Sequence, residues 1–319
     1  MNKSTDPTWS TVNDDGASIW AGPAAEFLQG FLSSGADTVW SPELFRWKLG
    51  PNNPAGQGYL SLAVVDDKVI ATTSITPKRL WLDGNVVVGG EIGDTYTAEQ
   101  FRSRGAPAEL YAGDNDPEAY VNKSVFGRLV SETRRRAESD GLQLIYGTPN
   151  QNSMPGYIKR LDFFHFNSTR CKSFVRFRAE GLLQRKPGLR SARFVFIGLD
   201  KLFSGMLGAF AGASSIGSKI DTAYPSVDDI DGLWARLKSE FNFTLVRDAA
   251  WFRFRYLEHP NAQYQFVTLR RRDQLDGFMI FLRLRDMSGN RVLAVADWLV
   301  RPQDKSGFAW LLAEGIKLF

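Results

Sequence analysis

The sequence predicts an α/β fold in which helices cover a mixed sheet, and three segments lead to this prediction. Residues 90–97 are typical of a central strand that runs into a loop. A helical run follows at 125–139, and residues 142–147 have the composition of a second strand. A strand, a helix and a further strand in this order form a βαβ unit with parallel strands. Because ligands bind beyond the carboxyl ends of such strands, residues 95–104 and 148–157 should surround one crevice.

Helices are predicted from apolar spacing and from capping residues. The first is expected at residues 24–32 and the second at 42–49, where Ser41 is a suitable N-cap and Pro42 suits the first helical position. Within residues 125–139 the apolar side chains recur on one helical face, and Gly141 is expected to end that helix.

Two hairpins are predicted before the βαβ unit, and they make the sheet mixed. In the first hairpin, strands at 59–65 and 69–76 are joined by a turn at Asp66-Asp67. In the second, strands at 79–82 and 86–88 are joined by a turn at Asp83-Gly84. Four further segments are expected to be an inserted loop or lid at 106–120, a strand at 174–177, a basic linker at 186–191 and an apolar helix at 199–216. We interpret the apolar segment at 199–216 as an interdomain helix, and the alternative is a helix that lies on a membrane surface.

Composition excludes several classes of protein. The 319 residues suit two domains, and a net charge of +4 is small for a nucleic-acid binder. The basic runs 134–136 and 270–272 are interpreted as solvated faces. The single cysteine, Cys171, fits a reducing compartment, and the polar N-terminus has no apolar signal segment. Since no apolar run is long enough to span a bilayer, we expect a cytoplasmic protein without transmembrane segments.

An internal repeat is indicated by three short matches at a nearly constant shift of about 205 residues. Residues 45–48 resemble 252–255, the hairpin turn at 66–68 resembles that near Asp273, and residues 92–95 resemble 295–298. The second copy has no Arg-x-x-Gly loop after Asp297 and no counterpart to residues 142–157. We therefore expect a first domain at 1–180, a linker at 181–225 and an incomplete or degenerate second domain at 226–319.

Two blocks of the sequence resemble the GNAT acyltransferase superfamily in its tandem-domain form. The first is Gly-Glu-Ile-Gly-Asp-Thr-Tyr-Thr at 90–97 followed by Phe-Arg-Ser-Arg-Gly at 101–105, and the second, more distinctive block spans 146–163. The resemblance covers residues 44–166, with a weaker echo at 251–319. It implies that an acyl-CoA, either acetyl-CoA or another acyl-CoA, lies between two splayed parallel strands and passes its acyl group directly to an amine.

The cofactor's diphosphate needs backbone N–H groups at the start of a helix. The family pattern is met only in part, because Pro107 follows the Arg-x-x-Gly sequence and has no N–H group. The resemblance therefore implies a divided loop. Its expected phosphate ligands are Arg102, Arg104 and Gly105 from the first part, and Lys123, Ser124, Val125 and Phe126 from the second part.

Catalytic roles are expected for three side chains. The resemblance implies that Tyr157, on a helix that faces the crevice, protonates the departing thiolate. Glu91 and Asp94 compete as the base that receives the amine proton, and regular strand alternation would place them on opposite faces. Asp297 matches Asp94 in the second copy, whereas Ala294 stands opposite Glu91. This comparison favours Glu91, acting through water.

The remaining cofactor contacts are expected at both strand ends. Backbone groups of Thr95, Tyr96 and Thr97 would pair with the pantetheine arm, and Asn150 and Ser153 would bind it from the other strand. No metal site is expected, since His165, His259 and Cys171 are the only histidine and cysteine residues and are far apart in the chain.

The leading interpretation is an acyl-CoA-dependent N-acyltransferase that acts on a small-molecule amine, with amino sugars of surface polysaccharides as the favoured acceptor. One alternative is a Fem-type aminoacyl transferase, which shares the tandem fold and would need a basic groove for tRNA. The other is a non-catalytic GNAT-like binding module that no longer holds CoA.

Overall fold

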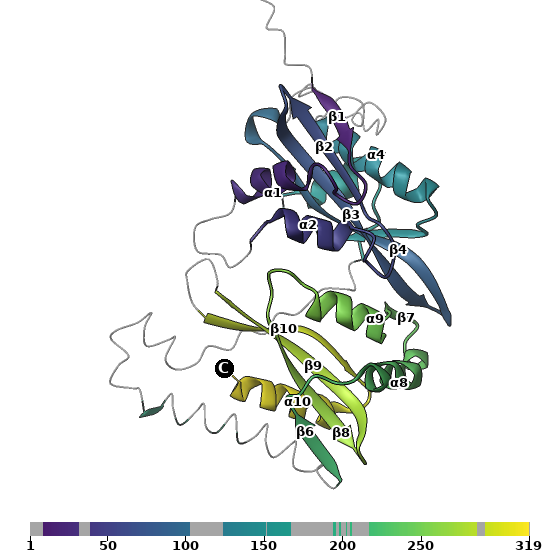
Figure 1. Cartoon of the computed structure of the whole chain (residues 1–319), viewed down its shortest axis with the longest axis vertical. Helices are drawn as coiled ribbons and strands as arrows, with labels where there is room; N and C mark the ends of the chain where they lie inside the picture. The colour runs from purple at the N-terminus through teal and green to yellow at the C-terminus, as the bar shows by residue number, and fades with distance from the viewer. Residues whose placement is uncertain are drawn as a thin grey trace, which may run out of the picture.

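The computed structural model describes residues 9–31, 39–102, 124–150, 152–166, 217–285 and 291–318, together with the isolated residues 194, 195, 198, 202 and 205. These residues form two sheets, one above the other in Figure 1, and helices pack on both faces of each sheet. The segments predicted at 106–120, 174–177 and 186–191 lie outside the described residues, as does 199–216 apart from two isolated residues.

The first sheet has the strand order β1-β2-β3-β4-β5. Its strands are β1 (Ser10–Asn13), β2 (Tyr59–Val65), β3 (Lys68–Leu82), β4 (Asn85–Thr97) and β5 (Leu144–Gly147). Only the β4–β5 pair is parallel, so the predicted mixed sheet is confirmed. The two predicted hairpins are present, but residues 69–76 and 79–82 belong to one continuous strand, β3. Both turns have the positive φ angles of tight hairpins, for example 47° at Asp66 and 60° at Asp67.

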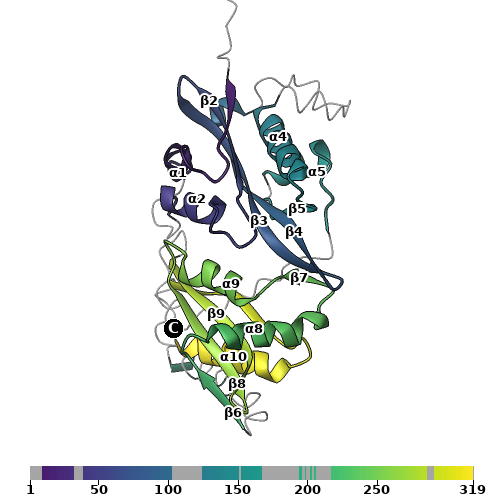
Figure 2. The ribbon, with the colours of Figure 1, turned by 45° about the vertical axis from the view of Figure 1, so that its right-hand side comes forward.

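Helices cover both faces of this first sheet (Figure 2). On one face lie α1 (Ala21–Gln29) and α2 (Pro42–Leu49), and on the other lie α4 (Val125–Ser139) and α5 (Met154–Arg160), with the short η1 (Glu99–Phe101) after β4. Ser41 caps α2 as predicted, because its Oγ accepts from the Leu44 N–H. Ser124, which was predicted as a phosphate ligand, caps α4, because its Oγ accepts from the Gly127 N–H. The first helix begins and ends earlier than predicted.

The second sheet has the order β10-β9-β8-β6, and all of its pairs are antiparallel. Its strands are β6 (Ser218–Asp221), β8 (Tyr264–Arg271), β9 (Gln274–Arg285) and β10 (Arg291–Val300). The helices of this half are α8 (Val227–Leu237), η5 (Lys238–Glu240), α9 (Ala249–Phe252), the π-helix η6 (Arg253–Leu257) and α10 (Lys305–Lys317). Strand β6 lies within the segment predicted as a linker, so the second sheet begins before residue 226.

The predicted repeat corresponds to a repeated order of elements. With the short elements η1, η5 and β7 left aside, the order in the first half is β1, α1, α2, β2, β3, β4 and α4, and in the second half it is β6, α8, α9 with η6, β8, β9, β10 and α10. The matching hairpins have the same two-residue turn, since Arg272 and Asp273 also have positive φ angles. Among the described residues, β5 and α5 have no equivalent in the second half.

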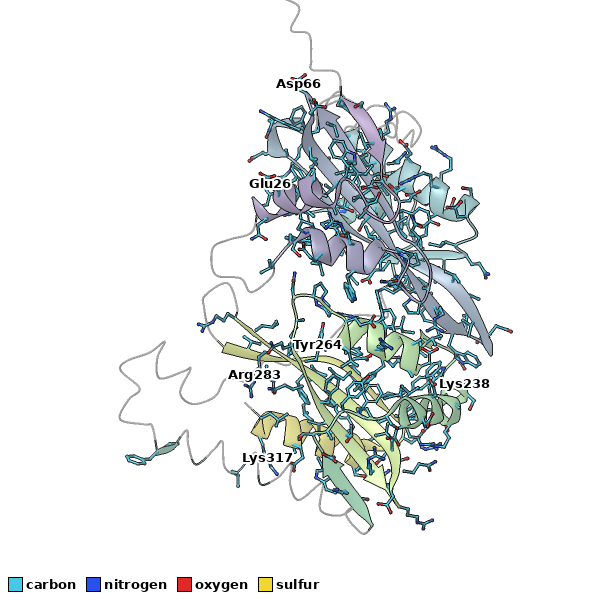
Figure 3. The ribbon with its side chains drawn as sticks, in the orientation of Figure 1. Glu26, Asp66, Lys238, Tyr264, Arg283 and Lys317 are labelled. Atoms are coloured by element: carbon cyan, nitrogen blue, oxygen red, sulfur yellow. The ribbon has the colours of Figure 1, made fainter. Side chains whose placement is uncertain are left out.

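Each half has an apolar core on both faces of its sheet, and Figure 3 shows the side chains that fill these layers. In the first half, Phe45 and Leu49 of α2 pack on one face, while Ile75 and Val130 pack on the face of α4. In the second half, Phe252 of α9 is buried with Leu233 of α8 and with strand residues of β9. None of the helices in the described ranges is long and apolar enough to cross a membrane.

The two halves share a strand and an aromatic contact. Strand β7 (Phe243–Leu245) follows the second-half helix η5 but pairs with residues 80–82 of β3 in the first sheet. Trp47 stacks on Phe254 with ring centroids 4.7 Å apart, and its indole N–H donates to the Phe254 carbonyl at 3.0 Å. These two residues occupy matching positions of the repeat.

A bidentate ion pair joins the halves beside this contact, and its removal should destabilise the protein. Both terminal nitrogens of Arg79 donate to Asp248 at 2.7 Å, and both side chains are mostly buried. We expect Arg79→Ala to lower the free energy of unfolding by about 2 kcal/mol, because Asp248 loses charged hydrogen bonds. Urea denaturation followed by circular dichroism would measure this change.

The matched control is Arg253→Ala, whose pair with Glu258 is 71% and 41% exposed at its two side chains. Removal of this exposed pair should change the free energy of unfolding by less than about 1 kcal/mol. Equal effects of the two substitutions would contradict the importance of the contact between the halves.

Candidate functional site

The parallel strands β4 and β5 part at their carboxyl ends. Their pairing runs from Gly89 and Leu144 to Ile92 and Gly147, where β5 ends. Strand β4 continues to Thr97, and beyond Ile92 no described strand pairs with the edge that faced β5. Backbone groups at this edge are therefore available to hydrogen-bond a ligand that lies between the strands. The crevice predicted at the ends of the two strands corresponds to this opening.

A β-bulge interrupts β4 at the same level. Ser74 pairs with Gly93 and Thr72 with Tyr96, so β4 has one residue more than β3 across this interval. Asp94 lies in the bulge with a φ of 51°, in the left-handed region. The extra residue turns the Asp94 side chain to the α2 face, the face on which Glu91 also lies. The prediction that Glu91 and Asp94 occupy opposite faces is therefore wrong, because the strand is not regular.

Tyr157 lies on α5 and reaches across the opening to β4. Its hydroxyl donates to Thr95 Oγ1 at 2.9 Å, and its ring packs edge-on against Phe126 and Phe163 at centroid distances of 5.3 and 5.1 Å. Burial raises the pKa of Tyr157 to about 12, and the hydrogen bond with Thr95 opposes this rise. The phenol is therefore protonated at neutral pH, as a proton donor must be. Thr95 is held in turn by Thr73 Oγ1 at 2.8 Å.

Asp94 is engaged by two neighbouring side chains. Lys48 of α2 forms an ion pair with its carboxylate, and Ser74 Oγ donates to the same oxygen at 2.5 Å. Burial lowers the pKa of Lys48 to about 7, the charge of Lys78 acts in the same direction, and Glu91 opposes it. Lys48 is itself mostly buried in this contact. Only 6% of the Asp94 side chain is exposed.

Glu91 is the more accessible of the two carboxylates, with 41% of its side chain exposed. Its only described ion pair is a long one, with Lys78 Nζ at 3.4 Å, and Lys78 also lies 4.7 Å from the ring centre of Trp251 in the second half. Burial lowers the pKa of Lys78, an effect that Glu91 opposes. Tyr146 stands opposite Glu91 on β5, and its pKa is raised by burial first and by the Glu91 charge second.

Glu91 and Tyr157 lie on opposite faces of β4. Ile92 packs in one apolar cluster with Tyr157 on the α4 side, so its neighbour Glu91 points to the α2 side. A group held between β4 and β5 could therefore be approached from the face of Glu91 while a leaving group departs on the face of Tyr157.

The start of α4 borders the opening. Ser124 caps this helix, and the N–H groups of Val125 and Phe126 belong to its first turn, where no upstream helical carbonyl can accept them. Such N–H groups suit an anion. At the end of β4, Arg102 Nε donates to the Thr97 carbonyl at 2.9 Å, and its guanidinium lies 4.9 Å from the ring centre of Tyr96. The predicted phosphate ligands Arg104, Gly105 and Lys123 lie outside the described residues.

Two other predicted cofactor ligands organise the start of α5. Asn150 Oδ1 accepts from the N–H groups of Asn152 and Ser153, each at 3.0 Å, and from Ser153 Oγ at 3.1 Å. This network fixes the turn between β5 and α5 and so positions Tyr157. Tyr96, whose backbone was predicted to contact the cofactor, stacks its ring on Phe31 of the α1 side at 3.9 Å.

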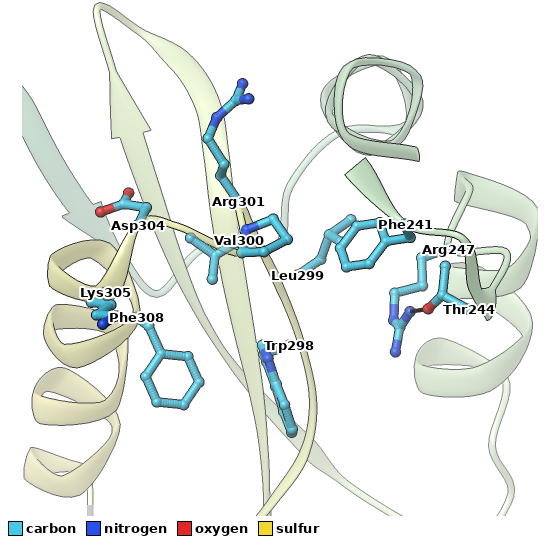
Figure 4. Close-up of a pocket in the computed structure, with 11 residues that line it drawn as sticks. Phe241, Thr244, Arg247, Trp298, Leu299, Val300, Arg301, Asp304, Lys305 and Phe308 are labelled. Atoms are coloured by element: carbon cyan, nitrogen blue, oxygen red, sulfur yellow. Dashed lines mark hydrogen bonds between the residues drawn. The ribbon is translucent and has the colours of Figure 1, made fainter. Parts of the chain in front are cut away.

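In the second half, the strand and helix that correspond to β4 and α4 are β10 and α10, and the start of α10 has a different charge from the start of α4. A pocket of about 400 Å³ lies around the end of β10 and is lined by Arg247 near β7, Trp298 of β10 and Phe308 of α10, among others (Figure 4). Asp304 caps α10, accepting from the Gly307 N–H at 2.8 Å, and pairs with Arg271. Against the opposing effect of burial, the hydrogen bonds from Arg271 lower the pKa of Asp304, so a carboxylate stands at this helix start. A carboxylate there disfavours a phosphate, whereas the neutral Ser124 does not.

Sequence reasoning gave no role to several side chains of this region. They are Lys48, Ser74, Lys78 and Tyr146. Lys48 belongs to the repeated Phe-Arg-Trp-Lys block, which was the available signal. The described residues contain no group of three or more His, Cys, Asp or Glu side chains that could hold a metal ion.

Comparison with known proteins was informative at the level of structure only. No model of a protein family and no curated protein matches the chain. A probable N-acyltransferase from Enterococcus faecalis matches with a TM-score of 0.52 and 10% identity over 96% of this chain and 62% of that protein. Saccharomyces cerevisiae N-myristoyltransferase, crystallised with myristoyl-CoA and inhibitors, matches with a TM-score of 0.51 and 13% identity over 98% of this chain and 74% of the enzyme.

The chain has the fold of the GNAT acyltransferases. In another crystal structure of the yeast enzyme, with bound myristoyl-CoA, the TM-score is 0.46 at 13% identity, and the match covers 95% of this chain and 65% of the enzyme. The chain thus spans less than two thirds of the length of the probable N-acyltransferase and of the yeast enzyme in this second structure. At these sequence identities the likeness establishes the fold of the two halves. The activity has to be inferred from the residues of the site.

The hydroxyl of Thr95 should be important for stability, because the buried Tyr157 hydroxyl donates to it and Thr73 shares it. We expect Thr95→Val to lower the free energy of unfolding by about 1–3 kcal/mol, since the buried phenol loses its acceptor. Thr95→Ser keeps the hydroxyl and should cost less than about 1 kcal/mol. Urea denaturation of both variants provides the measurement, and a valine variant as stable as the serine variant would contradict the bridge.

Proposed function

We propose that the protein is an acyl-CoA-dependent N-acyltransferase that moves an acyl group from CoA to a small-molecule amine by direct attack in a ternary complex. One observation carries this proposal. Strands β4 and β5 part after Ile92 and Gly147, and Tyr157 crosses the opening to donate to Thr95 at 2.9 Å. The opening offers free strand edges to an extended polar chain, and a protonated phenol lies beside it.

The chemistry of the transfer fits the charges on the two faces of β4. Formation of the C–N bond and cleavage of the C–S bond require the amine to lose a proton and the departing thiolate to gain one. In this proposal Glu91 takes the amine proton through a water molecule on the α2 face. Tyr157 gives its phenolic proton to the thiolate on the α4 face, and solvent then returns a proton to the phenolate.

The opening and the start of α4 provide the contacts that the acyl donor needs. Backbone groups of residues 95–97 would bond the pantetheine arm along the free edge of β4, with Asn150 and Ser153 on the other side. The first-turn N–H groups of Val125 and Phe126 would hold the diphosphate, with Arg102 nearby and Arg104, Gly105 and Lys123 as further candidates. We propose acetyl-CoA as the donor, and other acyl-CoA molecules belong in the same assay.

The acceptor approaches, in this proposal, from the face shared by α2 and the second half. Glu91, Lys78 and Trp251 meet there, and Trp251 belongs to α9. The second half thus contributes to the acceptor side and carries no reaction of its own. Amino sugars of surface polysaccharides are the narrowest acceptor class that we put forward, and free amino acids and polyamines are the natural comparison in a substrate panel.

Release of free thiol from acetyl-CoA in the presence of an amine panel tests the proposal. Transfer without tRNA would exclude the Fem-type alternative. Absence of transfer together with no acetyl-CoA binding by calorimetry up to millimolar concentration would favour the binding module and would overturn our proposal.

Removal of the two proposed proton-transfer groups should lower turnover. We expect Tyr157→Phe and Glu91→Gln each to reduce kcat by about 10²–10⁴-fold while KM for the acyl donor changes little, because each group acts on the transition state. Tyr224→Phe and Glu314→Gln, whose residues lie in the second half away from the opening, are the matched controls and should keep wild-type turnover. If the site variants turn over as fast as these controls, the assigned roles are wrong.

The pH dependence of turnover provides an independent check on Tyr157. Because burial raises its pKa to about 12, the phenol keeps its proton at every pH below that value and loses it only above. We therefore expect kcat to show no decline assignable to Tyr157 between about pH 7 and pH 10, where an ordinary tyrosine begins to ionise. A decline in this range that Tyr157→Phe abolishes would contradict the assignment.

A further inference from the structure

The bulge of β4 is held from three directions. The Asp94 carboxylate pairs with Lys48 and accepts from Ser74 Oγ at 2.5 Å, while the Asp94 carbonyl accepts from Thr72 Oγ1 at 2.6 Å. The φ of 51° at Asp94 is a left-handed conformation, which a residue with a Cβ adopts at a cost in energy. Such a conformation persists where the surrounding contacts determine it, and here they come from α2 and β3.

A related arrangement occurs in the second half, where an aspartate follows a bulge without the left-handed φ of Asp94. Strand β10 also has a bulge, where Val295 pairs with Phe281 and Asp297 with Ile280. Asp297 accepts from Arg247 Nε at 3.1 and 3.0 Å and from the Tyr256 hydroxyl at 2.7 Å. The two aspartates occupy matching positions of the repeat, and each is mostly buried and paired with a cation. Because the second half has no parted parallel strands among its described residues, the shared function of these carboxylates is to stabilise the bulge.

The bulge decides which way the next side chain points. Asp94 turns toward α2, and Thr95 consequently turns toward the α4 side, where it accepts from Tyr157 and contacts Thr73. A regular strand would place Thr95 on the other face. The position of the Tyr157 hydroxyl beside the opening therefore depends on the contacts of Asp94.

We propose that Lys48 and Ser74 are positioning residues, which act through Asp94 to fix the bulge that aligns Thr95 and Tyr157 with the acyl donor. Asp94 is then a part of this structural unit and not the base. The inference rests on the proposed function where it concerns turnover, but the link between the Asp94 contacts and the shape of β4 is independent of any reaction.

A double-mutant cycle on the full-length protein tests the proposal. The variants are Asp94→Asn, Lys48→Met and the double substitution, with Lys48→Arg as the conservative variant. Each is measured for kcat, for KM of acetyl-CoA and for amide hydrogen exchange of a peptide that covers residues 92–97. Asp297→Asn, in the matching position of the second half, is the control.

We expect Asp94→Asn and Lys48→Met each to lower kcat by about 10²-fold with little change in KM, because a small misplacement of reacting groups has this effect. The double variant should recover about tenfold over either single variant, since it leaves no unpaired buried charge. Lys48→Arg should keep most of the activity. Amide exchange at 92–97 should be faster in both single variants than in the wild-type protein. In the double variant it should be slower than in either single variant. Asp297→Asn should leave kcat within about twofold of wild type.

The proposal is overturned if Lys48→Met has a normal kcat while Asp94→Asn is inactive and is not rescued by adding Lys48→Met. That result would identify Asp94 as the base. If the wild-type protein transfers no acyl group, the proposed function fails by itself, and the exchange measurement still decides: unchanged exchange at 92–97 in Asp94→Asn overturns the proposal. If circular dichroism shows that a charge-removing variant does not fold, Ser74→Ala is used in its place. We expect this variant to have faster exchange at 92–97 and a lower kcat. If neither quantity changes, the proposal is wrong.

Discussion

The separation of β4 from β5 after Ile92 and Gly147 is the constraint on which the candidate site depends. Two features of the sequence account for it. Pro149, two residues beyond the last pair, has no N–H group with which to continue the ladder. On the other strand, the bulge at Asp94 bends β4 and increases its twist. The ladder therefore ends with β5 at Gly147 while β4 continues to Thr97, and the polar groups along this edge of β4 are left available.

The bridge from Tyr157 to Thr95 gives this opening a defined geometry. It connects the helix that follows β5 with the strand that leaves it, so the two sides of the opening are held at a fixed separation. The cap at Asn150 and Ser153 fixes the start of that helix, and the ring contacts of Tyr157 with Phe126 link it to α4. The second half repeats the strands and the bulge but has a carboxylate at the start of α10. The order of elements thus occurs twice, while the features suited to an acyl donor occur together in the first half.

Much of the architecture was predictable because it follows from local signals. Ser41 and Ser124 mark helix starts, Gly141 ends α4 with a φ of 95°, and Asp66-Asp67 forms the tight turn that its composition favours. The relative orientation of Glu91 and Asp94 was not predictable in this way. A bulge changes the face of every following side chain, and its cause here is the contact of Asp94 with Lys48, a residue 46 positions away in the chain.

Other elements of the site needed the folded chain for the same reason. Lys78 and Trp251 come together only because the second half packs against the first, and Tyr146 faces Glu91 only through the parallel register of β4 and β5. The position of Tyr157, by contrast, followed from the distinctive block after β5. Its proposed role as an acid and the role of Glu91 as a base remain predictions.

A crystal structure of the protein with a non-hydrolysable acetyl-CoA analogue tests the central claim most directly. The account predicts a pantetheine arm between residues 93–97 of β4 and residues 148–150 after β5, with the diphosphate at the N-terminus of α4 and the Tyr157 hydroxyl next to the sulfur. Analogue bound beside β10, or residues 93–97 and 148–150 paired with each other as continuous strands, would contradict it.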